Sequence, residues 1–197
     1  MNGKRGTGLM SRFRGMKMLR RIITTLLCVL MVAAVFPTGP AFAQAQTERR
    51  GASGQPLPRF AIIQADRARM RVGPGFNYAT RWIYKRAGLP VEIIEEYGTW
   101  RQVRDSDGTT GWMHVSVLSS KRNAMVAPWL RNSEEAQNFE LQSSPNDSAR
   151  TIAQIEPGVI LRMKECDGTW CEVEVKGVSG YIQQDDLWGA YPGEAFN

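Results

Sequence analysis

The sequence is poor in the side chains that most catalytic sites need. It has one histidine, His114, among 197 residues, and no Ser-His-acid trio can be assembled without it. Because His114 follows Trp112 in an expected strand, a structural or exposed position is favoured over a catalytic one. Gly73-Pro74-Gly75 is too short for a phosphate-binding loop and lacks a Lys-Ser/Thr pair. We therefore expect no enzyme and no cofactor.

Paired carboxylates do not change this expectation. Glu95-Glu96 and Asp185-Asp186 are adjacent in the sequence, and neighbouring residues of a strand point to opposite faces. Such pairs cannot share a proton as a catalytic dyad does, so solvated charge is the favoured interpretation.

The first 43 residues contain no acidic residue. Seven basic residues precede an uncharged apolar run at 22–36, and Ala41-Phe42-Ala43 follows it. This order of basic, apolar and small residues is typical of a secretory signal peptide. The alternative is a membrane anchor, but the run of about 15 residues is shorter than the about 20 that span a bilayer. We predict a signal peptide at 1–43, cleavage after Ala43, no membrane anchor afterwards, and a periplasmic or extracellular location.

The rest of the chain has no excess of basic residues. The chain has 25 basic and 19 acidic residues, and the seven basic residues of the leader leave 18 against 19. The high isoelectric point therefore belongs to the leader. Nucleic-acid binding loses its electrostatic basis, because such proteins carry a basic surface.

Long helical patterns are also missing. Residues 44–58 are rich in Gln, Gly, Ser and Pro, have almost no large apolar side chains, and are predicted to form a disordered linker. From Arg59 onward, short runs of Val, Ile, Trp and Tyr alternate with Gly, Pro, Asn and Asp. No helical period lasts two turns, so the pattern predicts an all-β protein with many short strands.

An internal repeat of about 70 residues organises these strands. Residues 88–95 correspond to 158–165, 100–103 to 170–173, and 111–113 to 180–182. Each copy is expected to curl into a small barrel, since about 60 residues in short strands can bury a modest core only in that way. We predict domain 1 at 59–120 and domain 2 at 121–191.

Cysteine spacing predicts a disulfide in the second copy. Cys166 and Cys171 flank an expected turn, and their spacing does not fit a redox Cys-x2-Cys motif. Two cysteines and one histidine cannot complete a structural zinc site, so no metal is expected. In an exported chain these cysteines are expected to pair, although two reduced, partly buried thiols remain the alternative. So short a loop would stabilise the fold by about 2 kcal/mol.

Three motifs carry a family resemblance: Met70-Arg71-Val72-Gly73-Pro74-Gly75, Trp100-Arg101-Gln102-Val103 and Gly111-Trp112-Met113. With their counterparts in the second copy, they resemble bacterial SH3-like (SH3b) domains, of a tandem exported type from Gram-negative bacteria. The resemblance implies two tandem SH3-like β-barrels and a binding or targeting module without a reaction. It implies peptidoglycan (cell wall) as the partner. The alternatives are an adaptor for an envelope protein and, more distantly, an enzyme. The second copy departs from the pattern at Gln142 and Ser144.

Aromatic and basic residues concentrate in the first copy. Aromatic faces stack on sugars, and arginine pairs with carboxylates, both of which peptidoglycan offers. The alternative is that the aromatic residues form the core. Residues 59–118 hold 9 basic and 6 acidic residues, whereas 119–197 hold 7 and 12. We therefore expect the first copy to bind the ligand, with Gln142 and Ile152 as matched positions in the second. The predicted ligand-binding residues are Arg71, Tyr78, Trp82, Tyr84, Trp100 and Trp112.

Overall fold

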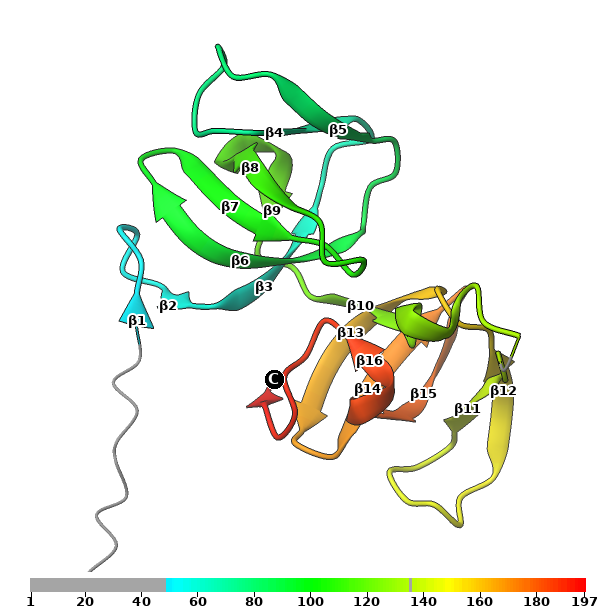
Figure 1. Cartoon of the computed structure of the whole chain (residues 1–197). Helices are drawn as coiled ribbons and strands as arrows, with labels where there is room; N and C mark the ends of the chain where they lie inside the picture. Colours follow the sequence, from blue (N-terminus) through cyan, green and yellow to red (C-terminus); the bar gives the residue numbers. More distant parts are fainter. Residues whose placement is uncertain (1–48, 135) are drawn as a thin grey trace, which may run out of the picture. The chain divides into compact units, whose positions relative to one another are not determined.

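The computed structural model describes residues 49–134 and 136–197, and strands make up most of the regular structure (Figure 1). In this part of the chain the only helical segments are three short 3-10 turns, η1 (Val115–Val117), η2 (Pro128–Leu130) and η3 (Gln184–Asp186). The all-β prediction is confirmed. The predicted signal peptide at 1–43 and the start of the predicted linker lie outside the described residues.

The first repeat forms a seven-stranded antiparallel sheet. Its strands are β3 (Arg59–Ile63), β4 (Ala68–Arg71), β5 (Thr80–Tyr84), β6 (Pro90–Tyr97), β7 (Trp100–Arg104), β8 (Thr110–His114) and β9 (Leu118–Ser119). They pair in the order β5-β4-β8-β7-β6-β3-β9. The sheet curls, as Figure 1 shows, and β5 is its terminal strand.

The second repeat has the same topology with one added strand. Its strands are β10 (Asn123–Val126), β11 (Phe139–Gln142), β12 (Thr151–Ile155), β13 (Ile160–Asp167), β14 (Trp170–Val175), β15 (Val178–Gln183), β16 (Leu187–Trp188) and β17 (Ala195–Phe196). The order is β12-β11-β15-β14-β13-β10-β16, with β17 paired to β13. The matching strand orders agree with the duplication inferred from the sequence. β17 lies beyond residue 191, where the second domain was predicted to end.

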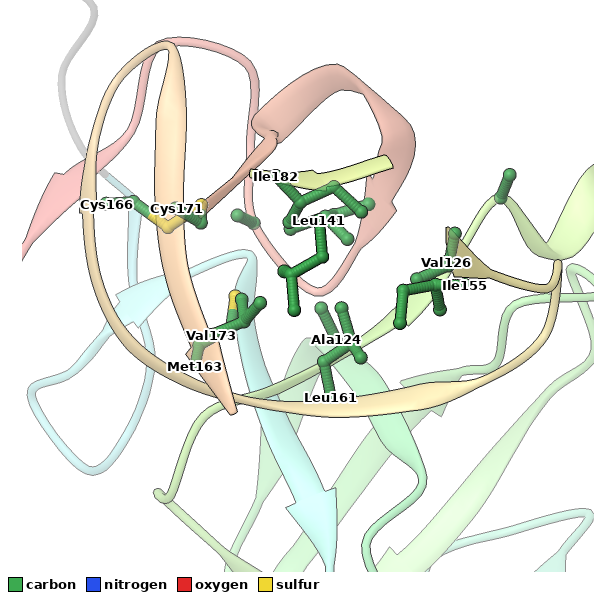
Figure 2. Packing of buried hydrophobic residues seen from close by; sticks show 13 residues of the cluster. Ala124, Val126, Leu141, Ile155, Leu161, Met163, Cys166, Cys171, Val173 and Ile182 are labelled. Carbon is green, nitrogen blue, oxygen red and sulfur yellow. A yellow bond between two sulfur atoms is a disulfide. The ribbon is translucent and has the colours of Figure 1, made fainter. Parts of the chain in front are cut away.

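Alternating side chains build one core in each repeat. In the first repeat the core includes Ile63, Met70, Val103 and Met113, all fully buried. Figure 2 shows the second core, where Leu141, Leu161, Val173 and Ile182 are among the residues that point into the barrel. The two clusters have separate members, so each repeat has a hydrophobic core of its own.

The predicted disulfide between Cys166 and Cys171 is confirmed. The two residues lie directly opposite each other on β13 and β14, with Cα atoms 4.1 Å apart. The bridge borders the second core (Figure 2). It closes the hairpin around the turn at Gly168, which has a positive φ of 101°.

The glycines before the long central strands occupy the expected turns. Gly88 and Gly158 have φ angles of 85° and 83°, a region that residues with a Cβ rarely adopt. The Gly88 N–H donates to the carbonyl oxygen of Ile63 at 2.8 Å, and that of Gly158 donates to Val126 at 2.6 Å. The duplicated glycine therefore closes the same turn in both repeats.

The segment before β3 corrects one prediction. β1 (Arg49–Arg50) and β2 (Pro56–Leu57) form an antiparallel hairpin, within the segment predicted to be a disordered linker. Leu57 is buried in the first core. Residues 49–58 are therefore ordered, because they find partners on the first sheet that are distant in the sequence.

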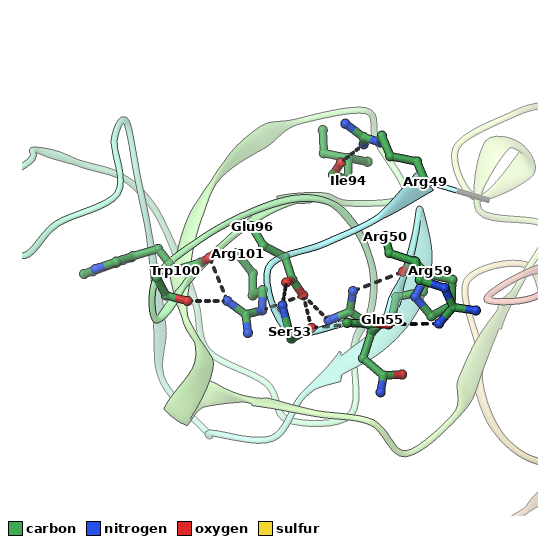
Figure 3. A network of polar contacts seen from close by, with 12 residues as sticks. Arg49, Arg50, Ser53, Gln55, Arg59, Ile94, Glu96, Trp100 and Arg101 are labelled. Carbon is green, nitrogen blue, oxygen red and sulfur yellow. Dashed lines mark hydrogen bonds and ion pairs between the residues drawn. The ribbon is translucent and has the colours of Figure 1, made fainter. Parts of the chain in front are cut away.

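The main partner on the first sheet is Glu96 of β6, which Figure 3 shows at the centre of a polar network. Its side chain is 0% exposed and accepts hydrogen bonds from the backbone N–H of Ser53 at 2.7 Å and the Ser53 hydroxyl at 2.8 Å. Arg59 pairs with it at 2.6 Å, and Arg101, its cross-strand neighbour on β7, at 3.2 Å. Burial alone would raise the pKa of Glu96, but the hydrogen bonds from Ser53 and Arg59 and the charge of Arg101 lower it to about 2.

Side chains of the first repeat also contact side chains of the second repeat. The Phe60 ring centroid lies 5.1 Å from that of Trp188 and 4.8 Å from that of Tyr191. The Tyr191 hydroxyl donates to Glu92 at 2.9 Å, and the buried Glu92 carboxylate also accepts from Arg104 at 2.8 Å. Burial of Glu92 is thus accompanied by hydrogen bonds from both repeats.

Candidate ligand-binding site

The loop between β4 and β5, residues 72–79, is called the arc here. Its ends are joined by a hydrogen bond from the Val72 N–H to the carbonyl oxygen of Ala79 at 3.0 Å. The Tyr78 ring lies so close to Gly73 that a Cβ at this position would be 2.4 Å from a ring carbon. Arg71 donates to the Tyr78 carbonyl oxygen at 2.6 Å. Gly73 is therefore required by the ring packed over it, and Arg71 holds the end of the loop.

Arg71 belongs to a row of outward-facing side chains on three strands. It is the cross-strand partner of Trp112 on β8, and Trp112 is the partner of Gln102 on β7. Cross-strand partners share one face of a sheet, so the three side chains lie side by side. Arg71 and Trp112 are half-buried. This row and the arc together form what we call the arc face.

Phe76, at the tip of the arc, completes the arc face. Its side chain is 71% exposed, and its ring centroid lies 4.9 Å from that of Trp100 and 5.4 Å from that of His114. The Arg71 guanidinium carbon lies 5.8 Å from the Phe76 ring centroid. Arg69 helps to line the open hollow of about 280 Å³ that lies beside these side chains. The hollow thus combines an exposed aromatic ring with guanidinium groups.

His114 has a structural role in this arrangement. Its Nδ1 lies 2.7 Å from the Ser116 hydroxyl and accepts from the Ser116 N–H at 3.3 Å, which caps η1. The ring is half-buried and forms part of the wall of the hollow. This position agrees with the structural role expected from the sequence.

The structure separates the six residues predicted to bind a ligand. Arg71 and Trp112 lie on the arc face, and Trp100 lies on the same side but is buried beneath Phe76 and His114. Tyr78 is exposed, with its ring folded onto Gly73. Phe76, Arg69 and His114 line the hollow beside the arc face and were not among the six predicted residues.

Tyr84 was wrongly included in the predicted site. It is 8% exposed, and its hydroxyl donates to Asp105 at 2.6 Å. Burial, together with this hydrogen bond, raises the pKa of Tyr84 well above its usual value. Tyr84 is a core residue with a satisfied hydroxyl, so its ring cannot stack on a ligand.

Trp82 is a surface residue on a different side of the sheet. It lies opposite Met70, which points into the core, and therefore away from the side that Arg71 occupies. A bulge between Met70 and Arg71 interrupts the pairing at this point. Because β5 is the terminal strand, the Trp82 side chain remains 58% exposed.

The second repeat keeps the arc backbone and replaces its side chains. The Ser143 N–H donates to the Arg150 carbonyl oxygen at 3.0 Å, as Val72 does to Ala79. Asp147 occupies the position of Phe76, and it accepts a hydrogen bond at 2.8 Å from Gln183, which occupies the position of His114. A polar pair thus replaces the aromatic contact in the second arc.

Two further substitutions follow from the strand register. Ala153 lies opposite Leu141, just as Trp82 lies opposite Met70. The counterpart of Trp82 is therefore Ala153, whereas the sequence had suggested Ile152. Gln142, in place of Arg71, is buried. The second repeat also has a hollow of about 490 Å³ beside Trp170, but Glu165, Asp167 and Glu172 line it. The hollow of the second repeat is thus lined by acidic side chains, whereas that of the first repeat is lined by arginines.

Comparison with known protein families identifies the fold. The family description "Bacterial SH3 domain" matches residues 64–120 and again residues 136–189. The chain belongs to the bacterial SH3 domain family. The two matches fall on the two repeats, which confirms the tandem SH3-like architecture.

A curated relative of this SH3 pair is the putative N-acetylmuramoyl-L-alanine amidase YrvJ of Bacillus subtilis (strain 168). It is 23% identical over 170 residues, which cover 84% of this chain and 30% of the relative. The tandem SH3 chain therefore spans less than a third of the length of that protein.

Solved structures with a local likeness to the tandem SH3 chain include NlpC2 from Trichomonas vaginalis, at 14% identity and a TM-score of 0.30. That match covers 68% of this chain and 48% of the other. An NlpC/P60 family protein from Bacillus cereus ATCC 10987 has 12% identity and a TM-score of 0.28, covering 66% and 55%.

Residues 49–134 and 136–197 contain neither a candidate metal site nor a candidate membrane-spanning helix. No group of three or more His, Cys, Asp or Glu side chains in these ranges could hold a metal ion. No helix within them is long and apolar enough to span a bilayer.

Proposed function

We propose that this tandem SH3 protein is a non-catalytic module that binds peptidoglycan in the periplasm or outside the cell. The arc face of the first repeat is the binding surface. The observation that carries the proposal is the exposed Phe76 ring beside the Arg71 guanidinium, above the hollow that Arg69 lines.

The chemistry of this surface suits a peptidoglycan strand. An exposed aromatic ring packs against the apolar face of a sugar or peptide unit. The guanidinium groups of Arg69 and Arg71 can form paired hydrogen bonds with peptide carboxylates. A relative that is a putative N-acetylmuramoyl-L-alanine amidase supports the choice of partner, because that activity acts on a bond of peptidoglycan.

The second repeat lacks the side chains that this peptidoglycan-binding role requires. Asp147 and Gln183 bond to each other where the first repeat presents Phe76 and His114. The acidic side chains that line the second hollow would repel carboxylates, an effect that salt weakens. Binding to peptidoglycan is therefore assigned to the first repeat alone.

Co-sedimentation of the chain with purified sacculi tests the proposal. Phe76→Ala should weaken binding about tenfold, since a lost aromatic contact of about 1.4 kcal/mol corresponds to that factor. Arg71→Gln, which installs the residue of the second repeat, should weaken binding and make it less sensitive to salt. Asp147→Ala is the matched control in the second repeat and should leave binding unchanged.

Circular dichroism melts must show that each variant remains folded. Wild-type protein that stays in the supernatant, or equal losses from Phe76→Ala and Asp147→Ala, would contradict the assignment. In that case the second candidate, an adaptor for an envelope protein, takes precedence. The exposed strand edge of the first repeat favours that candidate independently.

A further inference from the structure

Strand β5 has an open edge. It is the terminal strand of the first sheet and pairs with β4 on one side. Thr80, Arg81 and Trp82 are exposed along it. The free edge of a sheet presents backbone donors and acceptors that can pair with a further strand.

Trp82 makes this edge unusual. Proteins generally protect a free edge from pairing with other chains, and a large exposed apolar side chain works against that protection. Trp82 is 58% exposed and packs on the side of the strand away from Arg71. It is therefore not part of the arc face.

Three cations near Trp82 in the sequence have no acidic partner within the described residues. Arg81 donates to the Thr110 carbonyl oxygen at 3.0 Å, so its charge is not neutralised by a carboxylate there. Lys85 and Arg86 follow β5, are exposed, and form no ion pair within the described parts of the chain. The two carboxylates of the β7–β8 turn are engaged elsewhere, Asp105 with Tyr84 and Asp107 with Arg131.

The fold does not require these side chains. In the second repeat the corresponding edge strand, β12, has Ile152 and Ala153 in place of Arg81 and Trp82. Glu156 and Pro157 follow it where Lys85 and Arg86 follow β5. The same barrel therefore forms without the exposed tryptophan and without the three cations.

We propose that β5 is a docking edge for an extended, acidic peptide segment of a protein partner. The segment adds to the sheet as a further strand, through backbone hydrogen bonds to β5. An apolar side chain of the segment packs on the Trp82 indole, and its carboxylates pair with Arg81, Lys85 and Arg86.

Charge complementarity selects this occupant over a second copy of the chain. Two copies joined edge to edge through β5 would bring their cations together, which costs free energy. The docking edge also goes beyond peptidoglycan binding, because it uses a different side of the sheet from the arc face. Both surfaces can be tested in the same protein.

The probe is a fluorescently labelled eight-residue peptide of alternating Glu and Val, titrated with the full chain and followed by anisotropy. A peptide of alternating Lys and Val is the control. The acidic peptide should bind at least tenfold more tightly, its affinity should fall with added salt, and the amides of 80–84 should gain protection from hydrogen exchange.

Variants then identify the edge. Trp82→Ala, and separately Lys85→Glu with Arg86→Pro, should each weaken peptide binding about tenfold or more. Trp129→Ala, at an exposed tryptophan of the second repeat, and Phe76→Ala, on the arc face, should leave it unchanged. Trp82→Ala should still bind sacculi at the wild-type level. That result would show that the docking edge and the arc face act independently.

Three results would overturn the proposal. One is that the acidic and basic peptides bind with equal affinity, or that neither of them binds. Another is an equal effect of Trp82→Ala and Trp129→Ala on peptide binding. The third is a dimer in sedimentation experiments that dissociates on Trp82→Ala, which would assign the edge to a second copy.

Discussion

Replacing Glu96 by Gln should destabilise the first repeat in a pH-dependent way. The pKa of Glu96 is lowered from 4.5 to about 2, because Ser53, Arg59 and Arg101 stabilise its ionised form despite burial. A lowered folded-state pKa stabilises the protein above the unfolded-state value, and this contribution is lost as the pH falls through the folded-state value. The pH window for Glu96 therefore runs from about 4.5 down to about 2.

The magnitude follows from the same two pKa values. At about 1.4 kcal/mol per pKa unit, ionised Glu96 contributes about 3 kcal/mol to the free energy of unfolding at pH 7. At pH 3 the unfolded chain is protonated at this residue while most folded molecules are still ionised, so about 1 kcal/mol remains. The difference in unfolding free energy between the wild type and Glu96→Gln should therefore be smaller at pH 3 than at pH 7.

Urea unfolding at pH 7 and at pH 3 measures this difference. The NMR signal of the ring of His114, the only histidine, reports on the first repeat alone. Glu95→Gln is the matched control, because Glu95 is the preceding residue of β6 and is exposed. A difference for Glu96→Gln that stays constant between pH 7 and pH 3, or one no larger than that for Glu95→Gln, would refute the reasoning.

Three further changes have defined outcomes. Replacing both Cys166 and Cys171 by Ser should lower the unfolding free energy of the second repeat by about 2 kcal/mol in urea titrations, with no effect on the His114 signal. Gly73→Ala should cost about 1–3 kcal/mol by overpacking against Tyr78, and thermal melts should show that this cost largely disappears in a Tyr78→Ala background. Tyr84→Phe, which removes the hydrogen bond of the buried hydroxyl, should cost about 1 kcal/mol in the same melts. A Tyr84→Phe variant as stable as the wild type would contradict a stabilising role for this hydrogen bond.

The repeat, the strands and the disulfide were predictable because their signals are local. Gly88 and Gly158 mark the same turn, and Cys166 and Cys171 flank a hairpin whose geometry requires only that hairpin. The hairpin of β1 and β2 was missed because its order depends on Glu96, more than 40 residues away. Composition alone cannot reveal a partner at that distance.

The candidate site was only partly predictable for a related reason. In β5 the aromatic residues Trp82 and Tyr84 both lie on the core side of the strand, but the barrel covers only Tyr84. The position of an edge relative to the core is a property of the closed sheet, which a period-2 pattern does not contain. Phe76 had a usable signal, since a large apolar residue in a loop of Gly, Pro and Asn has little chance of entering a core.

The two repeats secure the same hairpin by different interactions. Glu96 and Arg101 face each other across β6 and β7 as Cys166 and Cys171 face each other across β13 and β14, at the corresponding positions of the two hairpins. An ion pair thus fastens the first hairpin where a covalent bond fastens the second. Acid should weaken the Glu96 ion pair of the first hairpin, whereas a reducing agent should break the disulfide of the second hairpin. The same hairpin therefore responds to a different solvent condition in each repeat, without any mutation.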